Sequence, residues 1–288
     1  MTDCIFDIAY LEKTKNDLCS ESKNVRRNCL DQLHSILHSS TCKFLSVNKV
    51  DVFRTVINVF FDKTEACRER AVNLVISCVN EWDVSEDEIM FYLLPIIHKR
   101  LVSGAETEPA EEVRLCLVKL MSAIVSKYKA DLAAHLKDVV EVLIRCICDE
   151  YPEVKKESCE CASNLAESVP EFRLHSEDII KAVHKILKHK HSKIRISAIN
   201  SLSKHDTACI DKFVKVIDCG SHILVPGNIV QFGQAGAVEL VCGALGESLT
   251  EQNPQVRLSV LRVAAFWFTK LRDRYSYFCY LLPLVLTM

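Results

Sequence analysis

The chain has 288 residues, in which 36 lysine and arginine residues nearly balance 38 aspartate and glutamate residues and leave a formal charge of −2. This balance excludes a global attraction to nucleic acid or anionic membranes, so any such contact has to be local. Hydrophobic residues make up 49% of the chain, which excludes disorder over most of it, and only 7 Gly and 7 Pro argue against a turn-rich all-β fold.

The N-terminal segment MTDCIFDIAYLEKTK carries Asp3 and Asp7 where a secretory signal needs positive charge, so we expect no signal peptide. We also find no uninterrupted apolar stretch of about 18 residues, the length that a membrane-spanning helix needs. The 15 cysteines are an odd number and lie mostly inside apolar runs such as NLVISCV. We interpret them as reduced core thiols of a cytosolic protein.

In chain order, a polar turn followed by an apolar residue, a basic residue and a helix occurs six times. The first apolar residues of the copies are Val25, Cys67, Val113, Val154, Ile194 and Val256. The basic residues that follow are Arg26, Arg68, Arg114, Lys155, Arg195 and Arg257. Eight positions after the first apolar residue lie Leu33, Val75, Met121, Ala162, Leu202 and Ala264. These columns predict one buried helical stripe repeated six times.

A second amphipathic segment precedes several of these helices, at 49–61, 88–101, 135–147 and 176–189. Ser85 and Glu88 fit a capping box at the start of one such segment, and Pro152 and Pro254 lie in turns, where a missing N–H donor is tolerated. Each repeat is therefore predicted to be a pair of helices. This pattern resembles HEAT repeats, which implies an all-α, right-handed solenoid whose second helices line the concave face.

The intervals between the copies are 42, 46, 41, 40 and 62 residues, so the last interval is about 20 residues too long. Removing 24 residues from Ser203 to Pro226 restores the period. We therefore predict HEAT repeats one to five in 1–202, an insertion or atypical loop in 203–226, and repeat six with the first helix of a truncated seventh repeat in 227–288. The insertion is either an ordered excursion or a segment particular to this isoform or gene model.

The last residues, YFCYLLPLVLTM, repeat the pattern of the earlier FYLLPIIHKRL segment. In that earlier copy Pro95 stands 18 residues before Val113, and the same distance from Pro283 runs past Met288. The sequence therefore predicts the first helix of an unfinished seventh repeat, as in a truncated form or a fragment of a longer array.

A polar residue of varying charge stands six positions after the first apolar residue of each copy. These residues are Asp31, Asn73, Lys119, Glu160, Asn200 and Arg262, called the polar row below. We expect them to be exposed and to be the candidate partner-binding residues, because a binding face differs from repeat to repeat. The basic column from Arg26 to Arg257 has an arginine or a lysine in every copy. Because it does not vary from repeat to repeat, we interpret its role as structural.

The sequence offers a zinc site only weakly, through Cys146, Cys148, Cys159 and Cys161 with His184, His189 and His191. Residues two apart on a helix point in different directions, and the C-x-x-C or H-x₃₋₅-H spacing of tetrahedral sites is missing. We therefore interpret the cysteines as core residues and predict no metal site. The basic stretch 181–195 allows local anion binding, although a solvated helix face explains it more simply.

The Gly-rich segment GQAGAVELVCGALG lacks both nucleotide-binding signatures, so we predict no cofactor there. We also find neither a hydrolase nor a metalloprotease motif, and no catalytic residue can be named. We therefore expect a protein that is not an enzyme and has no small-molecule substrate, nucleic acid or membrane as a partner.

Several longer sequence segments show a more specific resemblance to one family of HEAT-repeat proteins. The segments PEVKKESCECASNLAESVPEF, HKHSKIRISAI, GNIVQFG, NPQVRLSV and LRDRYSYFCYLLPLVL resemble the N-terminal third of the HEAT-repeat dynein axonemal assembly factors. The resemblance implies a cytoplasmic scaffold that assists preassembly of outer and inner dynein arms for motile cilia or flagella. The implied partners are axonemal dynein chains, including intermediate chains, chaperones and other dynein assembly factors.

Two other classes of function remain open. One is an adaptor built on the same HEAT-repeat fold, and the other is an enzyme. A HEAT-repeat adaptor for nuclear transport or for a phosphatase would bind a transport GTPase or a phosphatase catalytic subunit instead of dynein chains. An enzyme would need a pocket with perturbed titratable groups.

Overall fold

The computed structural model describes residues 8–37, 46–102, 104–204 and 253–270, together with the isolated positions Leu282 and Leu286. Every element among these residues is helical, as predicted. The chain forms two compact units, residues 1–139 and residues 140–288. Ser203 and Lys204 still belong to a helix, whereas the rest of the predicted insertion and the predicted seventh repeat lie outside the described elements.

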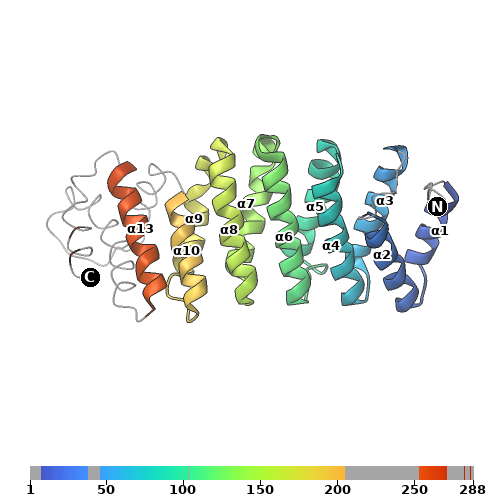
Figure 1. The fold of residues 1–288 in the computed structure, drawn as a ribbon, viewed down its shortest axis with the longest axis horizontal. Coiled ribbons are helices and arrows are strands. Elements are labelled where there is room, and N and C mark those ends of the chain that lie inside the picture. Colours follow the sequence, from blue (N-terminus) through green and yellow to red (C-terminus); the bar gives the residue numbers. More distant parts are fainter. Residues whose placement is uncertain are drawn as a thin grey trace. The chain divides into compact units, whose positions relative to one another are not determined.

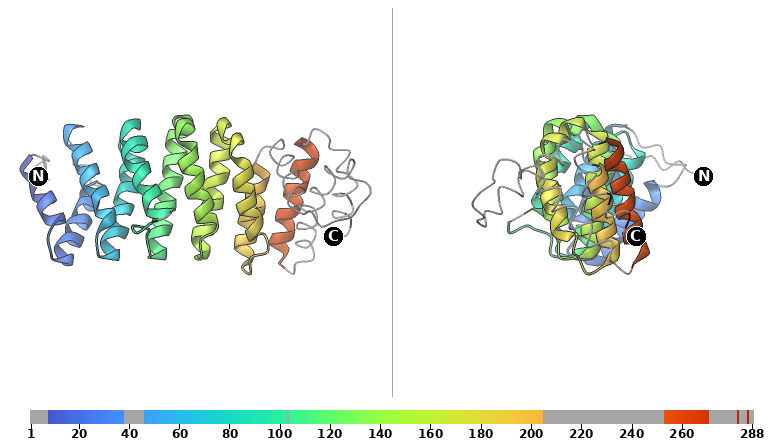
Figure 2. Two further views of the ribbon diagram at one scale, coloured as in Figure 1. Left: turned by 180° about the vertical axis from the view of Figure 1, so that it is seen from behind. Right: turned by 90° about the vertical axis from the view of Figure 1, so that its left-hand side faces the viewer.

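The first unit consists of helix pairs joined by short turns (Figure 1). Its elements are α1 (Ile8–Leu18), α2 (Lys23–Leu37), α3 (Ser46–Asn58) with the 3₁₀ turn η1 (Val59–Phe61), α4 (Glu65–Glu81), η2 (Glu88–Leu93), α5 (Leu94–Leu101), α6 (Glu111–Tyr128) and η3 (Lys129–His135). The second helices α2, α4 and α6 pack side by side in chain order, and each also contacts the helix before it in its repeat (Figure 2).

The second unit repeats this arrangement, and α7 (Leu136–Ile147) contains the boundary between the units. Its other elements are α8 (Pro152–Ser168), η4 (Pro170–Leu174), α9 (Ser176–Ile186), α10 (Ser192–Lys204) and α13 (Pro254–Lys270). Helix α10 packs against α8 on one side and α13 on the other. Pro152 and Pro254 each begin a helix, where the missing N–H has no intrahelical partner to lose.

The predicted helix 88–101 is not one regular helix. Its first part, η2, is a π-helical turn that runs into α5, and Pro95 lies at the start of α5. Pro95 has no N–H to donate to the backbone carbonyl one helical turn earlier, and the wider, π-helical turn η2 lies directly before it. Ser85 does accept a hydrogen bond from the Glu88 N–H at 3.4 Å, but the Glu88 carboxylate pairs with Arg54 instead of completing the capping box.

The repeated apolar columns form the core, as the periodicity predicts. Cys67, Val113, Val154, Ile194 and Val256 are buried at the first position, and Leu33, Val75, Met121 and Ala162 are buried eight residues later. Val25 differs, because 38% of it is exposed. The thiol of Cys67 donates to the Lys23 carbonyl of α2, so this position contacts the preceding second helix, and no described helix stands in that place for Val25.

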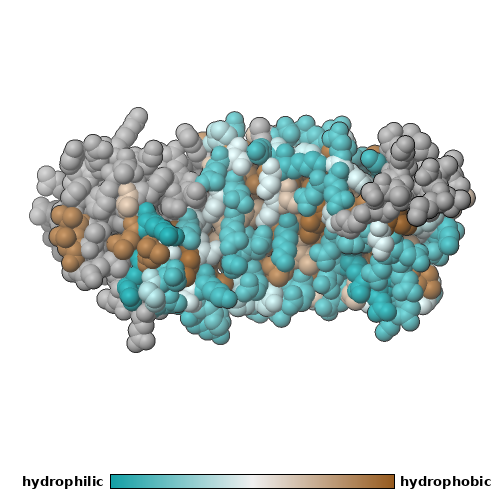
Figure 3. All heavy atoms as spheres, viewed as in Figure 1, coloured by the Kyte–Doolittle hydropathy of each residue, from teal (hydrophilic) through white to brown (hydrophobic). Residues whose placement is uncertain are grey.

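Polar side chains cover most of the described surface on one face of each unit (Figure 3). Among the described residues, no helix has both the length and the apolar run that crossing a bilayer requires.

The described cysteines are free thiols, and all of them except Cys19 and Cys148 are buried. Burial raises the pKa of Cys29 to about 11 and that of Cys159 to about 12. Because the thiolate is the nucleophile, we predict that iodoacetamide at pH 8 alkylates Cys19 and Cys148 in the folded chain long before Cys29 and Cys159. Site-resolved mass spectrometry over time checks this, with urea-unfolded chain as the control. Equal rates at all four sites would contradict the assigned burial.

Candidate functional site

All six residues of the polar row are exposed on the second helices. Three lie in the first unit on α2, α4 and α6, and three lie in the second unit on α8, α10 and α13. Their salt bridges are weak surface contacts: Arg70 meets Asp31 at 2.8 Å, and Lys156 meets Glu160 at 3.9 Å, with more than a third of each side chain exposed. The predicted exposure of this row is confirmed, and its role in binding a partner stays a prediction.

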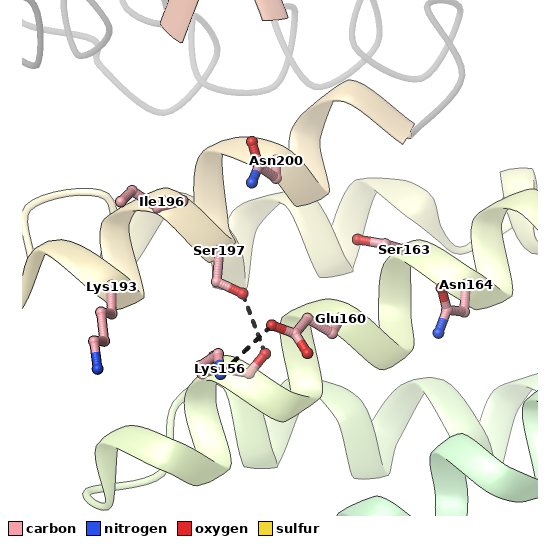
Figure 4. A pocket seen from close by; sticks show the side chains of 8 residues that line it. All are labelled: Lys156, Glu160, Ser163, Asn164, Lys193, Ile196, Ser197 and Asn200. Carbon is pink, nitrogen blue, oxygen red and sulfur yellow. Dashed lines mark hydrogen bonds and ion pairs between the residues drawn. The ribbon is translucent and has the colours of Figure 1, made fainter. Parts of the chain in front are cut away.

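In each unit, a surface groove formed by described residues contains members of the polar row. In the first unit a groove of about 470 Å³ lies over α1 and α2 and includes Asp31. In the second unit a groove of about 340 Å³ lies between α8 and α10 and includes Glu160 and Asn200 (Figure 4). Burial raises the pKa of Glu160, and the neighbouring Glu157 adds to this while Lys156 opposes it. Members of the row therefore border a surface groove in both units.

Four members of the basic column, Arg26, Arg68, Arg114 and Arg195, have the structural role that the regularity of the column predicts. Arg26 donates through Nη1 to the carbonyls of Ser20 and Glu21, at 2.6 and 3.0 Å. Arg114 and Arg195 donate in the same way to the carbonyls five and six residues before them, and Arg68 donates to the carbonyl six residues before it. Each guanidinium thus holds the turn in front of its own helix, where carbonyls are left without helical partners.

A further column, five residues before the first apolar position, was not predicted. Its described members are Ser20, Asp62, Glu108, Asp149 and His189. In each case a side-chain atom accepts a hydrogen bond from the N–H two residues later, at 2.7 to 3.2 Å. The side chains differ in type but all are acceptors, and they close the same kind of turn in five repeats. We call these residues the turn column.

In the first unit the turn column and the basic column join consecutive repeats. Arg26 of α2 pairs with Asp62 through Nε at 2.6 Å and Nη2 at 3.0 Å. Arg68 of α4 pairs with Glu108 through both Nε and Nη2 at 2.7 Å. Each pair is buried, and each carboxylate also closes the turn before the next second helix. A signal was present in the sequence, because acids recur at a fixed distance before the basic column.

Glu108 is the most buried charge of this set, at 1% exposure, and it receives a second guanidinium from Arg100. Burial by itself raises the pKa of Glu108. The hydrogen bonds from Arg68 and from the Ala110 N–H, with the charges of Arg100 and Arg68, outweigh burial and hold the pKa below its usual value. The carboxylate is therefore ionised and fully paired at neutral pH.

The residues of the zinc hypothesis do not form a common site. Cys146, Cys159 and Cys161 are buried, whereas Cys148 is exposed. Among the described residues, no group of three His, Cys, Asp or Glu side chains has an arrangement that fits a metal ion. The Gly-rich segment lies outside the described residues.

The basic stretch 181–195 forms part of α9, the following turn and the start of α10. Burial lowers the pKa of His184 and His189, and nearby cations lower it further, including Lys188 for His184 and Lys155 for His189. Both imidazoles therefore favour the neutral form. A groove of about 620 Å³ at this turn is lined by Lys190, His191 and Lys193 among others.

Comparison with protein families finds a model described as "Dynein axonemal assembly factor 5-like, TPR repeats" that matches residues 17–215 and 212–288. The intervals of 40 to 46 residues between the first five copies exceed the 34 residues of a tetratricopeptide repeat and fit HEAT or armadillo repeats.

Curated proteins named Dynein axonemal assembly factor 5 are similar over most of the chain. The Xenopus laevis protein is 30% identical over 280 residues, which is 96% of this chain and 30% of that protein. The Homo sapiens protein is 32% identical over 231 residues, covering 78% and 24%, and the Drosophila melanogaster protein is 25% identical over 292 residues, covering 98% and 32%. The chain spans between about a quarter and a third of the length of these relatives.

Solved structures of repeat proteins share the fold. A designed armadillo repeat protein in complex with the peptide (KR)4 has a TM-score of 0.61 at 15% identity, covering 89% of this chain and 99% of that chain. An engineered protein has a TM-score of 0.59 at 16% identity, covering 91% and 98%. At this level of identity the likeness shows the all-α solenoid fold alone.

Proposed function

The chain belongs to the family described as Dynein axonemal assembly factor 5-like, and from this we propose that it is a non-enzymatic cytoplasmic scaffold for the preassembly of axonemal dynein arms. Its partners in this proposal are dynein chains, chaperones and other assembly factors. The observation that carries the proposal is the family match across nearly the whole chain, together with relatives whose printed name is that of an axonemal dynein assembly factor.

The structure supports a scaffold through its surface. A solenoid exposes much surface for its length, and its second helices carry side chains that vary from repeat to repeat. The polar row provides such variation, since its members are acidic, neutral or basic and all are exposed. Their surface ion pairs are weak, so a partner can replace them at little cost.

The test is affinity purification of the tagged chain from ciliated cells, followed by mass spectrometry. We predict recovery of axonemal dynein chains with wild-type chain, and several-fold lower recovery with the double variant Asn73→Ala/Lys119→Ala, because both side chains lie on the exposed row of the first unit. The double variant Lys137→Ala/Asp138→Ala, which removes exposed side chains from α7, is the matched control and should recover dynein normally.

The free energy of unfolding of each purified variant should stay within about 0.5 kcal/mol of wild type, so that a loss of recovery reports binding. Recovery of a nuclear-transport GTPase or a phosphatase catalytic subunit in place of dynein chains would replace this proposal with an adaptor role. Equal recovery with both double variants would show that the first unit's polar row is not the contact surface.

A further inference from the structure

The groove between α8 and α10 has two matching stripes of side chains (Figure 4). Helix α8 contributes Lys156, Glu160, Ser163 and Asn164, and α10 contributes Lys193, Ile196, Ser197 and Asn200. Counted from Lys156, the other α8 residues lie four, seven and eight positions later, and counted from Lys193, the other α10 residues lie three, four and seven positions later, so each set lies on one face of its helix. At 1.5 Å per residue, the α8 stripe is about 12 Å long, which matches about four residues of an extended peptide.

The middle and far end of the groove suit a peptide backbone. Asn164 and Asn200 are exposed, and an amide side chain both donates and accepts hydrogen bonds. The hydroxyl of Ser163 donates to the Cys159 carbonyl at 2.8 Å, and that of Ser197 donates to the Lys156 carbonyl at 3.3 Å. Each hydroxyl oxygen therefore keeps lone pairs that can accept from a backbone N–H of a ligand.

The near end of the groove is positively charged. Lys156 and Lys193 lie at this end in Figure 4, and Lys193 also lines the neighbouring groove, where Lys190 and His191 face one carboxylate, Glu153. The Lys156 ammonium meets Glu160 only at 3.9 Å and is 40% exposed, so it is open to a stronger anionic partner.

We propose that the α8–α10 groove binds an extended peptide segment of a partner protein, with acidic side chains at the Lys156 and Lys193 end. Glu160 lies one helical turn after Lys156 on α8 and repels an acid beyond that turn, which sets the direction of the segment. This inference rests on the proposed scaffold function and specifies the chemistry of one partner contact. It differs in sign from the basic peptide that the designed armadillo repeat protein holds.

The test is fluorescence polarisation with the purified 288-residue chain and three labelled decapeptides, in which serine alternates with glutamate, glutamine or lysine. We expect the glutamate peptide to bind, with an affinity that falls as salt rises, and the other two to bind at least about tenfold more weakly. Lys156→Gln/Lys193→Gln should lower the affinity for the glutamate peptide about tenfold.

The matched control is Lys181→Gln/Lys185→Gln, which removes the same charge from α9 outside the groove lining and should change the affinity by less than about twofold. If both double variants lost the same affinity for the glutamate peptide, the net charge of the chain would explain the binding, and the proposal would be overturned. Equal or tighter binding of the lysine peptide would overturn it as well. This experiment contains no dynein. Its failure is therefore distinguishable from failure of the proposed function, which is read from the purification.

Discussion

Replacing Val75 with aspartate is expected to destabilise the first unit by about 3–5 kcal/mol, because the substitution places an unpaired carboxylate in a packed interior. Val75 is fully buried on α4, which packs against both α2 and α6. A loss of this size should lower the melting temperature by about 10 °C in a chain of this length. Thermal unfolding followed by circular dichroism measures the change.

The matched control is Asn73→Ala, two residues earlier on the same helix and exposed. It should change the free energy of unfolding by no more than about 0.5 kcal/mol. Similar melting temperatures for wild type and Val75→Asp would show that the apolar column has been assigned to the wrong face of the helix.

The sequence predicts the second helices well because their pattern depends only on local periodicity. An apolar residue recurs eight positions after another one, and burial of both requires only that the helix has one covered face. Val75 and Met121 follow this rule. Val25 does not, because burial of the first apolar position depends on a neighbouring second helix rather than on the pattern within its own repeat.

The first helices are predicted less accurately, because their geometry depends on single residues. Pro95 stands inside a continuous apolar pattern, and periodicity alone extends one helix through it, whereas the structure has a π-helical turn before α5. Glu88 fits a capping box by its spacing, but Arg54, 34 residues earlier, holds its carboxylate. A distant charged partner can override a local sequence motif.

The candidate site also has one feature that the sequence predicts and others that it does not. Exposure of the polar row follows from the same periodicity as the core and is confirmed. The turn column was missed because its members range from serine to histidine. Only Asp62, Glu108 and Asp149 share an acidic side chain, and the property common to all described members is the ability to accept a hydrogen bond. The ion pairs with the basic column join residues 36 and 40 positions apart, and such pairing cannot be deduced from one repeat.

Replacing Glu108 with alanine is expected to destabilise the first unit by about 3–5 kcal/mol, because the guanidinium groups of Arg68 and Arg100 then stay buried without their carboxylate. The turn before α6 also loses the acceptor of the Ala110 N–H. Urea unfolding measures the loss. The control is Glu21→Ala, which removes an exposed carboxylate whose salt bridge to Lys63 is 3.1 Å long, and it should leave the unfolding midpoint unchanged.

A triple variant separates unpaired charge from loss of volume. Replacing Glu108, Arg68 and Arg100 together with methionine removes all three buried charges, so it should be more stable than Glu108→Ala although it changes more residues. If the triple variant were less stable than Glu108→Ala, unpaired charge would not be the cause of the loss.

The pH dependence of stability provides an independent test of the contribution of the Glu108 carboxylate. The pKa of Glu108 in the folded chain lies below its ordinary value of 4.5, so its contribution to stability is complete above about pH 4.5 and is lost as the pH falls through the lower, folded-state value. Glu108→Ala has no such contribution to lose. The difference in unfolding free energy between wild type and Glu108→Ala should therefore narrow as the pH falls from 7 to about 3. A difference that stays constant over this range would mean that Glu108 contributes by packing, and that the ion pairs between consecutive repeats add nothing that depends on its charge.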